Sequence, residues 1–191
     1  MFTMDIMFGR QKEVFRIMPD TSTSWIWVTS VEWVDNPKMI GDESYSQWGY
    51  AENKFDGNTS NSFTKLNDTA IWKNSFHSYE YNMDWTDCPQ KTHNRLASGI
   101  LANDYIGYDA IIDRLIKHDF IYANLSENLG DFQADGSLGL NSLANNSDYN
   151  ISCFTENLYK YKVIDKDEFS IYFESEQGIR DSYIYFGHNQ M

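Results

Sequence analysis

Apolar residues recur at every second position in short runs, and this spacing restricts the chain to a fold built mainly from β-strands. Residues 2–8 alternate in this way, a four-residue turn that begins at Gly9 follows, and residues 13–18 run back as the second half of a hairpin. Pro19 has no N–H to donate to a strand ladder, so we expect it to end the second run. Aromatic side chains, which make up 16% of the residues, favour the half-buried surfaces of strands.

Further apolar runs predict the other elements. Strands are expected at residues 25–28, 76–83, 98–106, 108–122, 169–173 and 183–186. The part from Asp109 to Phe120 also fits helical spacing, and we interpret it as strand. Helical spacing predicts one helix over residues 151–160. Residues 35–50 are polar without a clear period and predict a long surface loop, and Gly178 is the expected turn between the last two strands.

The acidic composition narrows the classes of partner. The chain has 191 residues, enough for one domain with its own core, and a net charge of −13 with a pI near 4.5. Such a surface repels phosphates, so we expect neither nucleic acid nor anionic membranes as partners. No apolar run approaches the roughly 18 residues that a membrane-spanning helix needs. Acidity also suits a protein that works at low pH, and a surface charge that keeps the protein in solution is the alternative interpretation.

Cysteine and histidine usage gives no metal or redox motif. Cys88 and Cys153 could form one disulfide or remain two free thiols, and no C-x-x-C occurs. The four histidines, His77, His93, His118 and His188, lack metal-ligand spacing, and we expect them at the surface. The sequence therefore predicts no metal and no cofactor.

The segment from Asp20 to Ser24 is the candidate for chemistry. It places one carboxylate and four hydroxyls in a short bend between two apolar runs. Flanking strands would hold the carboxylate on a rigid platform, and hydroxyls that donate to it would lower its pKa. The alternative interpretation is a structural turn that joins two strands.

The wider pattern around this bend resembles the pepsin family of aspartic proteases. Residues 20–30, Asp-Thr-Ser-Thr-Ser-Trp-Ile-Trp-Val-Thr-Ser, are similar to the family signature Asp-Thr-Gly-Ser-Ser-x-Leu-Trp-Val-Pro-Ser. Further segments resemble the family in the same order along the chain: Gly9–Lys12, Phe55–Phe63, Ser98–Asp104, Ala134–Leu140, Cys153–Leu158, Asp167–Phe173 and Tyr185–Gly187. Ala134–Leu140 is similar to the motif Phe-Asp-Gly-Ile-Leu-Gly-Leu, which supports the catalytic loop from beneath, so Asp135 is not expected to be a second catalytic aspartate.

The resemblance implies a mainly β, pepsin-like acid protease lobe, with bent sheets or a partly closed barrel and one or two short helices. Residues 1–191 would form a single N-terminal lobe with a flap insertion at about 82–98 and no C-terminal lobe. The implied activity is aspartic-type endopeptidase cleavage of a polypeptide substrate, in which Asp20 is one of two catalytic aspartates. The implied supporting residues are Thr21, Thr23, Trp27, Gly136 and Gly139, and Tyr81 is the expected flap tyrosine, with Tyr79 as a competing match.

Several positions depart from the family pattern. Ser22 stands where the family has glycine, Pro19 and Ser137 stand where it has apolar residues, and Asn82 replaces the flap glycine. No second Asp-Thr-Gly or Asp-Ser-Gly occurs. A partner must then supply the second aspartate, either a missing C-terminal lobe or a second copy that pairs two Asp20 side chains. The alternative is a catalytically inactive half-lobe that acts as a peptide-binding or inhibitory module.

Location is inferred from the family and from glycosylation motifs. Five N-x-S/T sequons occur, at Asn58, Asn67, Asn124, Asn145 and Asn150. Together with the resemblance they predict a lumenal (lysosomal or vacuolar) or secreted glycoprotein, although an Asn-rich chain alone would also contain some. We expect no signal peptide before the first predicted strand, which would fit a cytosolic protein, a mature chain or a truncated gene model alike.

Overall fold

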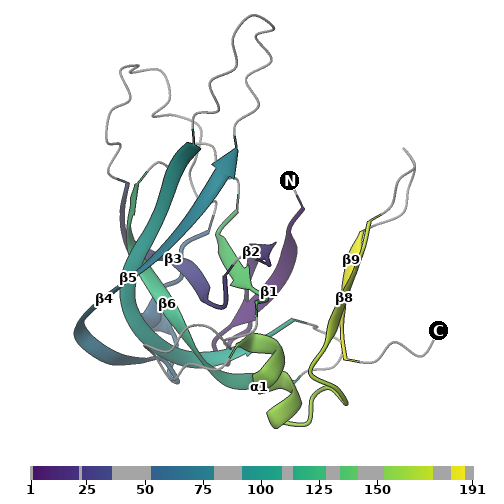
Figure 1. The fold of residues 1–191 in the computed structure, drawn as a ribbon. Coiled ribbons are helices and arrows are strands. Elements are labelled where there is room, and N and C mark those ends of the chain that lie inside the picture. The colour runs from purple at the N-terminus through teal and green to yellow at the C-terminus, as the bar shows by residue number, and fades with distance from the viewer. Residues whose placement is uncertain are drawn as a thin grey trace, which may run out of the picture.

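The computed structural model describes residues 2–21, 23–35, 53–79, 92–108, 114–127, 134–141, 153–173 and 182–187 (Figure 1). Its strands are β1 (Met4–Phe8), β2 (Glu13–Asp20), β3 (Ile26–Asp35), β4 (Thr64–Tyr79), β5 (Thr92–Gly107), β6 (Ile116–Glu127), β7 (Gly136–Gly139), β8 (Phe169–Tyr172) and β9 (Tyr183–Phe186). The helical elements are the 3₁₀ turn η2 (Gly57–Thr59) and the helix α1 (Phe154–Lys160).

The strands close into a barrel. The sheet order is β1-β2-β7-β3-β6-β5-β4, and an additional pairing of β1 with β5 joins the ends of the first six strands, which leaves β4 outside. The long β4–β5 hairpin extends beyond the barrel in Figure 1. The expected fold class, mainly β with a barrel and a short helix, is confirmed.

The predicted N-terminal hairpin is confirmed by the ladder of β1 and β2. Met4 lies opposite Ile17, and Phe8 lies opposite Glu13. Gly9 adopts a positive φ of 72°, a backbone conformation that costs glycine little, and its carbonyl accepts from the Lys12 N–H at 3.1 Å. The Gly9 N–H donates to the Tyr105 carbonyl at 2.8 Å, so the turn also fastens β1 to β5.

The prediction that Pro19 ends its strand is wrong, because β2 continues to Asp20. Pro19 pairs in parallel with Leu138, and the Asp20 carbonyl accepts from the Leu140 N–H at 2.8 Å on the β7 side. N–H groups alternate between the two edges of a strand, so the nitrogen of Pro19 faces the β1 side. The ladder with β1 has already ended at Met4 and Ile17. Pro19 therefore lies where the ladder needs no donor.

Aromatic rings form the centre of the core. Phe8, Phe15, Phe55 and Phe120 are completely buried. Ring centroids lie 5.5 Å apart for Phe8 and Phe15 and 5.2 Å apart for Phe8 and Phe120, in edge-to-face geometry. Such pairs add roughly 0.5–1.5 kcal/mol each beyond the burial of their area. The core thus fixes β1, β2 and β6 around Phe55, which lies in the segment before η2.

The helix α1 lies at one end of the barrel, and the last hairpin stands beside the barrel (Figure 1). Phe154 and Leu158 are buried on the inner side of α1, as the helical spacing predicted, and Cys153 caps the helix by accepting the Glu156 N–H at 3.4 Å. Cys153 is a free, buried thiol whose pKa is raised mainly by burial. Cys88 lies outside the described residues.

The remaining strand predictions are correct in type and differ in extent. The last two strands form the hairpin β8–β9, whose inner residues Phe169, Ile171, Ile184 and Phe186 pack on the core. The segment expected at 108–122 is strand β6 from Ile116 onward, and β4 begins twelve residues before the expected position 76. Asp35, expected in the loop, is the last residue of β3. Outside the described residues lie Gly178, residues 36–50, the parts of the expected strands at 80–83 and 109–113, and the part of the expected flap insertion from 82 to 91.

His118 is buried, so the prediction of a surface histidine is wrong at this position. Its exposed fraction is 2%, and its Nδ1 lies 2.6 Å from Nδ2 of Asn157 on α1. The ring also meets Phe154 edge to face at 5.5 Å. Burial lowers the pKa of His118 to about 3, because a charged imidazolium loses its hydration in the core. His118 therefore acts as a neutral link between β6 and the helix.

Candidate active site

Asp20 lies at the end of β2, where the barrel opens into the bend that leads to β3. It is half-buried, and its backbone pairs in parallel with Gly139 of β7. Residues alternate between the two faces of a strand. Phe15 and Ile17 point into the main core, so Met18 and Asp20 lie on the opposite face. This face also carries Trp27.

The strand β7 is wedged between β2 and β3 and holds the bend from beneath. It runs parallel to β2 and antiparallel to β3. A Cβ at Gly136 would collide with the carbonyl oxygen of Trp27, and a Cβ at Gly139 would collide with the backbone of Trp25. Both positions therefore require glycine for the close approach of a neighbouring backbone.

Backbone hydrogen bonds fasten the end of β7 to both sides of the bend. The Gly139 N–H donates to the Trp25 carbonyl at 2.8 Å, and the Asn141 N–H donates to the Thr23 carbonyl at 2.8 Å. The Leu140 N–H also donates to the Asp20 carbonyl. These hydrogen bonds hold the backbone of the bend both at its start and at its end. The carboxylate of Asp20 therefore belongs to a stretch of backbone that the end of β7 holds in place by hydrogen bonds.

The hydroxyls of the bend differ in environment. Thr21 is exposed, whereas Thr23 is buried with 9% of its surface accessible. The hydroxyl of Thr23 has no hydrogen-bond partner in the described part of the chain, so the expected bond to Asp20 is not formed. Ser22 lies outside the described residues.

The face around Asp20 is largely apolar. Trp27 is completely buried and clusters with Ala97, Ile121, Ala123 and Ala134, while Met18 and Trp25 pack against this cluster and are partly exposed. Ser137 lies opposite Trp27 in the ladder, and its completely buried hydroxyl has no hydrogen-bond partner among the described residues. Tyr81, the expected flap tyrosine, lies outside the described residues. Tyr79 is the last residue of β4.

Asp135 holds the start of β7 in place, a structural role that the sequence alone did not predict. Its side chain is completely buried and accepts the Arg16 N–H at 2.8 Å and the Asn53 N–H at 2.9 Å. The sequence does contain a signal for this role, because Asp135 is the one acidic residue in a segment of small and apolar residues. A carboxylate that such a segment buries needs several hydrogen-bond donors. These hydrogen bonds use the carboxylate of Asp135 to hold the start of β7. That point lies about 13 Å along the strand from the position of Asp20.

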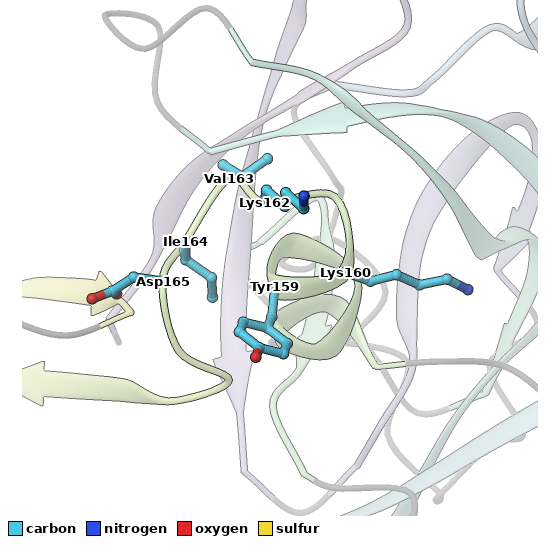
Figure 2. A pocket seen from close by; sticks show the side chains of 6 residues that line it. All are labelled: Tyr159, Lys160, Lys162, Val163, Ile164 and Asp165. Carbon is cyan, nitrogen blue, oxygen red and sulfur yellow. The ribbon is translucent and has the colours of Figure 1, made fainter.

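A surface pocket of about 610 Å³ lies elsewhere, at the end of α1 and the turn that follows it. Figure 2 shows its lining residues Tyr159, Lys160, Lys162, Val163, Ile164 and Asp165, with the Lys160 side chain extending away from the Asp165 carboxylate. None of these residues belongs to β2, β3 or β7, so the pocket is separate from Asp20.

The described residues contain no group of three or more histidine, cysteine or carboxylate side chains that could hold a metal ion. No helix in the described part is long and apolar enough to cross a membrane. Among the described residues, the groups at the end of β2 and in the bend after it include the Asp20 carboxylate, the hydroxyls of Thr21 and Thr23, and backbone amides.

Comparison with known proteins gives the family. The sequence model described as eukaryotic aspartyl protease matches residues 1–190, nearly the whole chain. No curated protein matches the chain significantly. The members of the matching family are proteases that act on polypeptides, and the barrel with its wedged glycine strand agrees with a pepsin-like lobe. The chain belongs to the eukaryotic aspartyl protease family.

Proposed function

We propose that this chain supplies one lobe and one catalytic carboxylate, Asp20, of an acid endopeptidase. The observation that carries the proposal is the position of Asp20 on a bend fastened from beneath by β7. A catalytic group needs a support that keeps its geometry, and strand ends held by backbone bonds supply one. The family match over residues 1–190 supports the same reaction class.

The chemistry requires a second carboxylate close to the first. Two carboxyl groups about 3 Å apart cannot both ionise, so one stays protonated while the other is charged. The charged group takes a proton from a shared water, which attacks the peptide carbonyl, and the neutral group donates to the carbonyl oxygen. Asp20 would be one of this pair, and the second would come from a C-terminal lobe or from a second copy of the chain.

The neighbouring residues then have supporting roles. Gly136 and Gly139 allow β7 to pass under the bend, and Thr21 would contact the opposing bend of the partner. Thr23 would donate to Asp20 once the bend closes on its partner, and Trp27 would support Tyr81 over the substrate.

Replacement of Asp20 tests the role of its carboxylate. In the chain assembled with its partner lobe or as a dimer, we expect Asp20→Asn to reduce cleavage of a denatured protein at about pH 4 by at least roughly 10²–10⁴-fold. Asp5→Asn, an exposed carboxylate on β1, is the matched control and should retain activity. Full activity of Asp20→Asn would exclude the proposal.

A non-enzymatic alternative is favoured by one observation. The hydroxyl of Thr23 makes no hydrogen bond in the described part of the chain, so it does not donate to Asp20 as the family pattern implies. In this case the chain binds or inhibits through a peptide-binding face. Binding of a statine-type inhibitor without cleavage by any assembled form would support the alternative, and cleavage that the inhibitor blocks would support the protease.

We further propose a lumenal or secreted location, in keeping with the family. The sequon at Asn58 is exposed on η2, whereas Asn124 lies half-buried in β6. After expression through a secretory pathway, we expect a glycan on Asn58, detected as a mass loss on enzymatic deglycosylation that Asn58→Gln abolishes. An unmodified Asn58 would contradict this expectation.

A further inference from the structure

Asp135 connects three segments that meet at the start of β7. Its carboxylate accepts backbone N–H groups from Arg16 on β2 and from Asn53, and Nδ2 of Asn53 adds a third contact at 3.2 Å. Its own N–H donates to the Arg16 carbonyl at 2.7 Å. Its carbonyl accepts from both the N–H and the hydroxyl of Thr29 on β3, at 2.9 and 3.0 Å. One residue therefore bonds to β2, to β3 and to the segment before Phe55.

The close crossings at Gly136 and Gly139 favour one register for the strand that follows, and side chains add little to it. β7 is four residues long, and two of these residues are glycine, so few side chains can interlock with β2 and β3. A shift of one residue would move β7 by about 3.3 Å and exchange its two faces. It would also separate Leu140 and Asn141 from the carbonyls of Asp20 and Thr23 that their N–H groups now reach.

We propose that Asp135 is a positioning residue that sets the register of β7 and, through it, the geometry of the bend that carries Asp20. The bonds of Asp135 fix the first residue of β7 against Ile17, and each later residue then meets its partner in turn, up to Gly139 beside Asp20. The catalytic consequence rests on the proposed function. The register itself is measurable without any activity.

Hydrogen exchange at the far end of β7 separates positioning from general stabilisation. In Asp135→Asn an amide NH₂ replaces one oxygen, so the backbone N–H of Arg16 or of Asn53 faces a donor instead of an acceptor. We expect the amides of Leu140 and Asn141 to lose protection by about ten- to a hundredfold relative to reference amides at α1, those of Asn157 and Tyr161, which lie on neither β5 nor β7.

Asp104→Asn is the matched control. Asp104 is also completely buried, and its carboxylate accepts the Tyr105 N–H at 2.7 Å and the Ser62 hydroxyl at 2.5 Å, but it lies on β5. We expect this variant to leave the ratio of Leu140 and Asn141 exchange to the reference amides unchanged. Equal effects of the two variants on that ratio would overturn the proposal.

A milder variant covers the case in which Asp135→Asn does not fold. Asn53→Ala removes only the side-chain donor to Asp135 and keeps the backbone one. It should lower the protection of Leu140 and Asn141 in the same direction by a smaller factor, and unchanged protection would contradict the proposal.

In the assembled protease, Asp135→Asn should lower kcat more than it raises KM, because the surfaces that bind the substrate stay in place while the Asp20 carboxylate moves. If Asp20 is not catalytic, the exchange result still stands and only the kinetic result fails.

Discussion

Buried polar side chains near the site fall into two groups at the residue scale. Asp135 is surrounded by donors, whereas the hydroxyls of Thr23 and Ser137 have no hydrogen-bond partner among the described residues. A buried polar group without a partner costs roughly 1–3 kcal/mol. Both hydroxyls lie close in sequence or register to the strand ends that carry Asp20 and Gly139. Two of the buried polar groups without a partner among the described residues are therefore located at the candidate site, and others, at Asp104 and Thr155, lie away from it.

His118 makes the stability of the fold depend on pH. Its pKa is about 3 in the folded protein, compared with 6.5 for an unperturbed histidine. Between these values the unfolded chain binds a proton that the folded chain does not, so stability is present above pH 6.5 and is lost as the pH falls toward 3. Asp104 lies opposite His118 in the β5–β6 register, yet burial dominates the shift.

We therefore expect His118→Gln, which keeps a neutral side chain able to bond Asn157, to flatten the pH dependence of unfolding. Below pH 6.5, the substitution should remove at most about 1.4 kcal/mol per pH unit from the slope of the unfolding free energy against pH. Urea unfolding at a series of pH values from 8 to 4 measures the slope in both proteins, and stability at pH 8 serves as the internal reference. Identical slopes would show that His118 does not titrate as the burial of its ring requires.

At the scale of elements, the wedged strand β7 decides how β2 and β3 approach each other. Its glycines allow a backbone contact that no other residue permits, and its backbone bonds close the bend. Close backbone contact is not confined to β7, because a Cβ at Gly99 on β5 would collide with the carbonyl oxygen of Tyr122. Gly107 at the end of β5 differs, since a Cβ there would first meet the flexible end of Leu115 at 2.8 Å.

We expect Gly139→Ala to destabilise the protein by at least about 1–3 kcal/mol, because the added methyl group collides with backbone that cannot move aside. Gly107→Ala adds the same methyl group against a movable side chain and should cost less. Chemical denaturation of the two variants gives the comparison. A smaller loss for Gly139→Ala than for Gly107→Ala would refute the close crossing.

At the scale of the whole molecule, the described residues place one carboxylate, that of Asp20, at the end of β2, whereas the proposed reaction needs two. Asp20 lies at the end of its strand, half-buried, where a partner could face it. The two candidate partners predict a different dependence of activity on protein concentration. A C-terminal lobe in the same polypeptide acts intramolecularly, whereas two copies of the chain must first associate.

We expect this chain by itself to cleave a denatured protein only if it dimerises. Activity per molecule would then rise with concentration and parallel the dimer fraction measured by analytical ultracentrifugation. Activity restored only by extension of the chain with a C-terminal lobe would identify the lobe as the partner. Concentration-independent activity of a monomer of this chain would contradict the need for a second carboxylate.

The sequence by itself determined the type of most elements and the position of Asp20 on a bend between strands. Period-two alternation identified β1, β2, β8 and β9, and helical spacing identified α1, because these patterns depend on neighbours along the chain. The motif around residues 20–30 also indicated the family. These signals are local, so one sequence is enough to read them.

Only the tertiary structure decided the features that depend on which strands lie side by side. Pro19 stays inside β2 because its nitrogen faces an edge where β1 has already ended, and His118 is buried because α1 packs over β6. Asp135 becomes an anchor because Arg16 and Asn53, distant in sequence, direct their N–H groups at it. Burial and hydrogen bonding across strands arise from pairings that no local pattern encodes, so the fold has to be assembled before they can be seen.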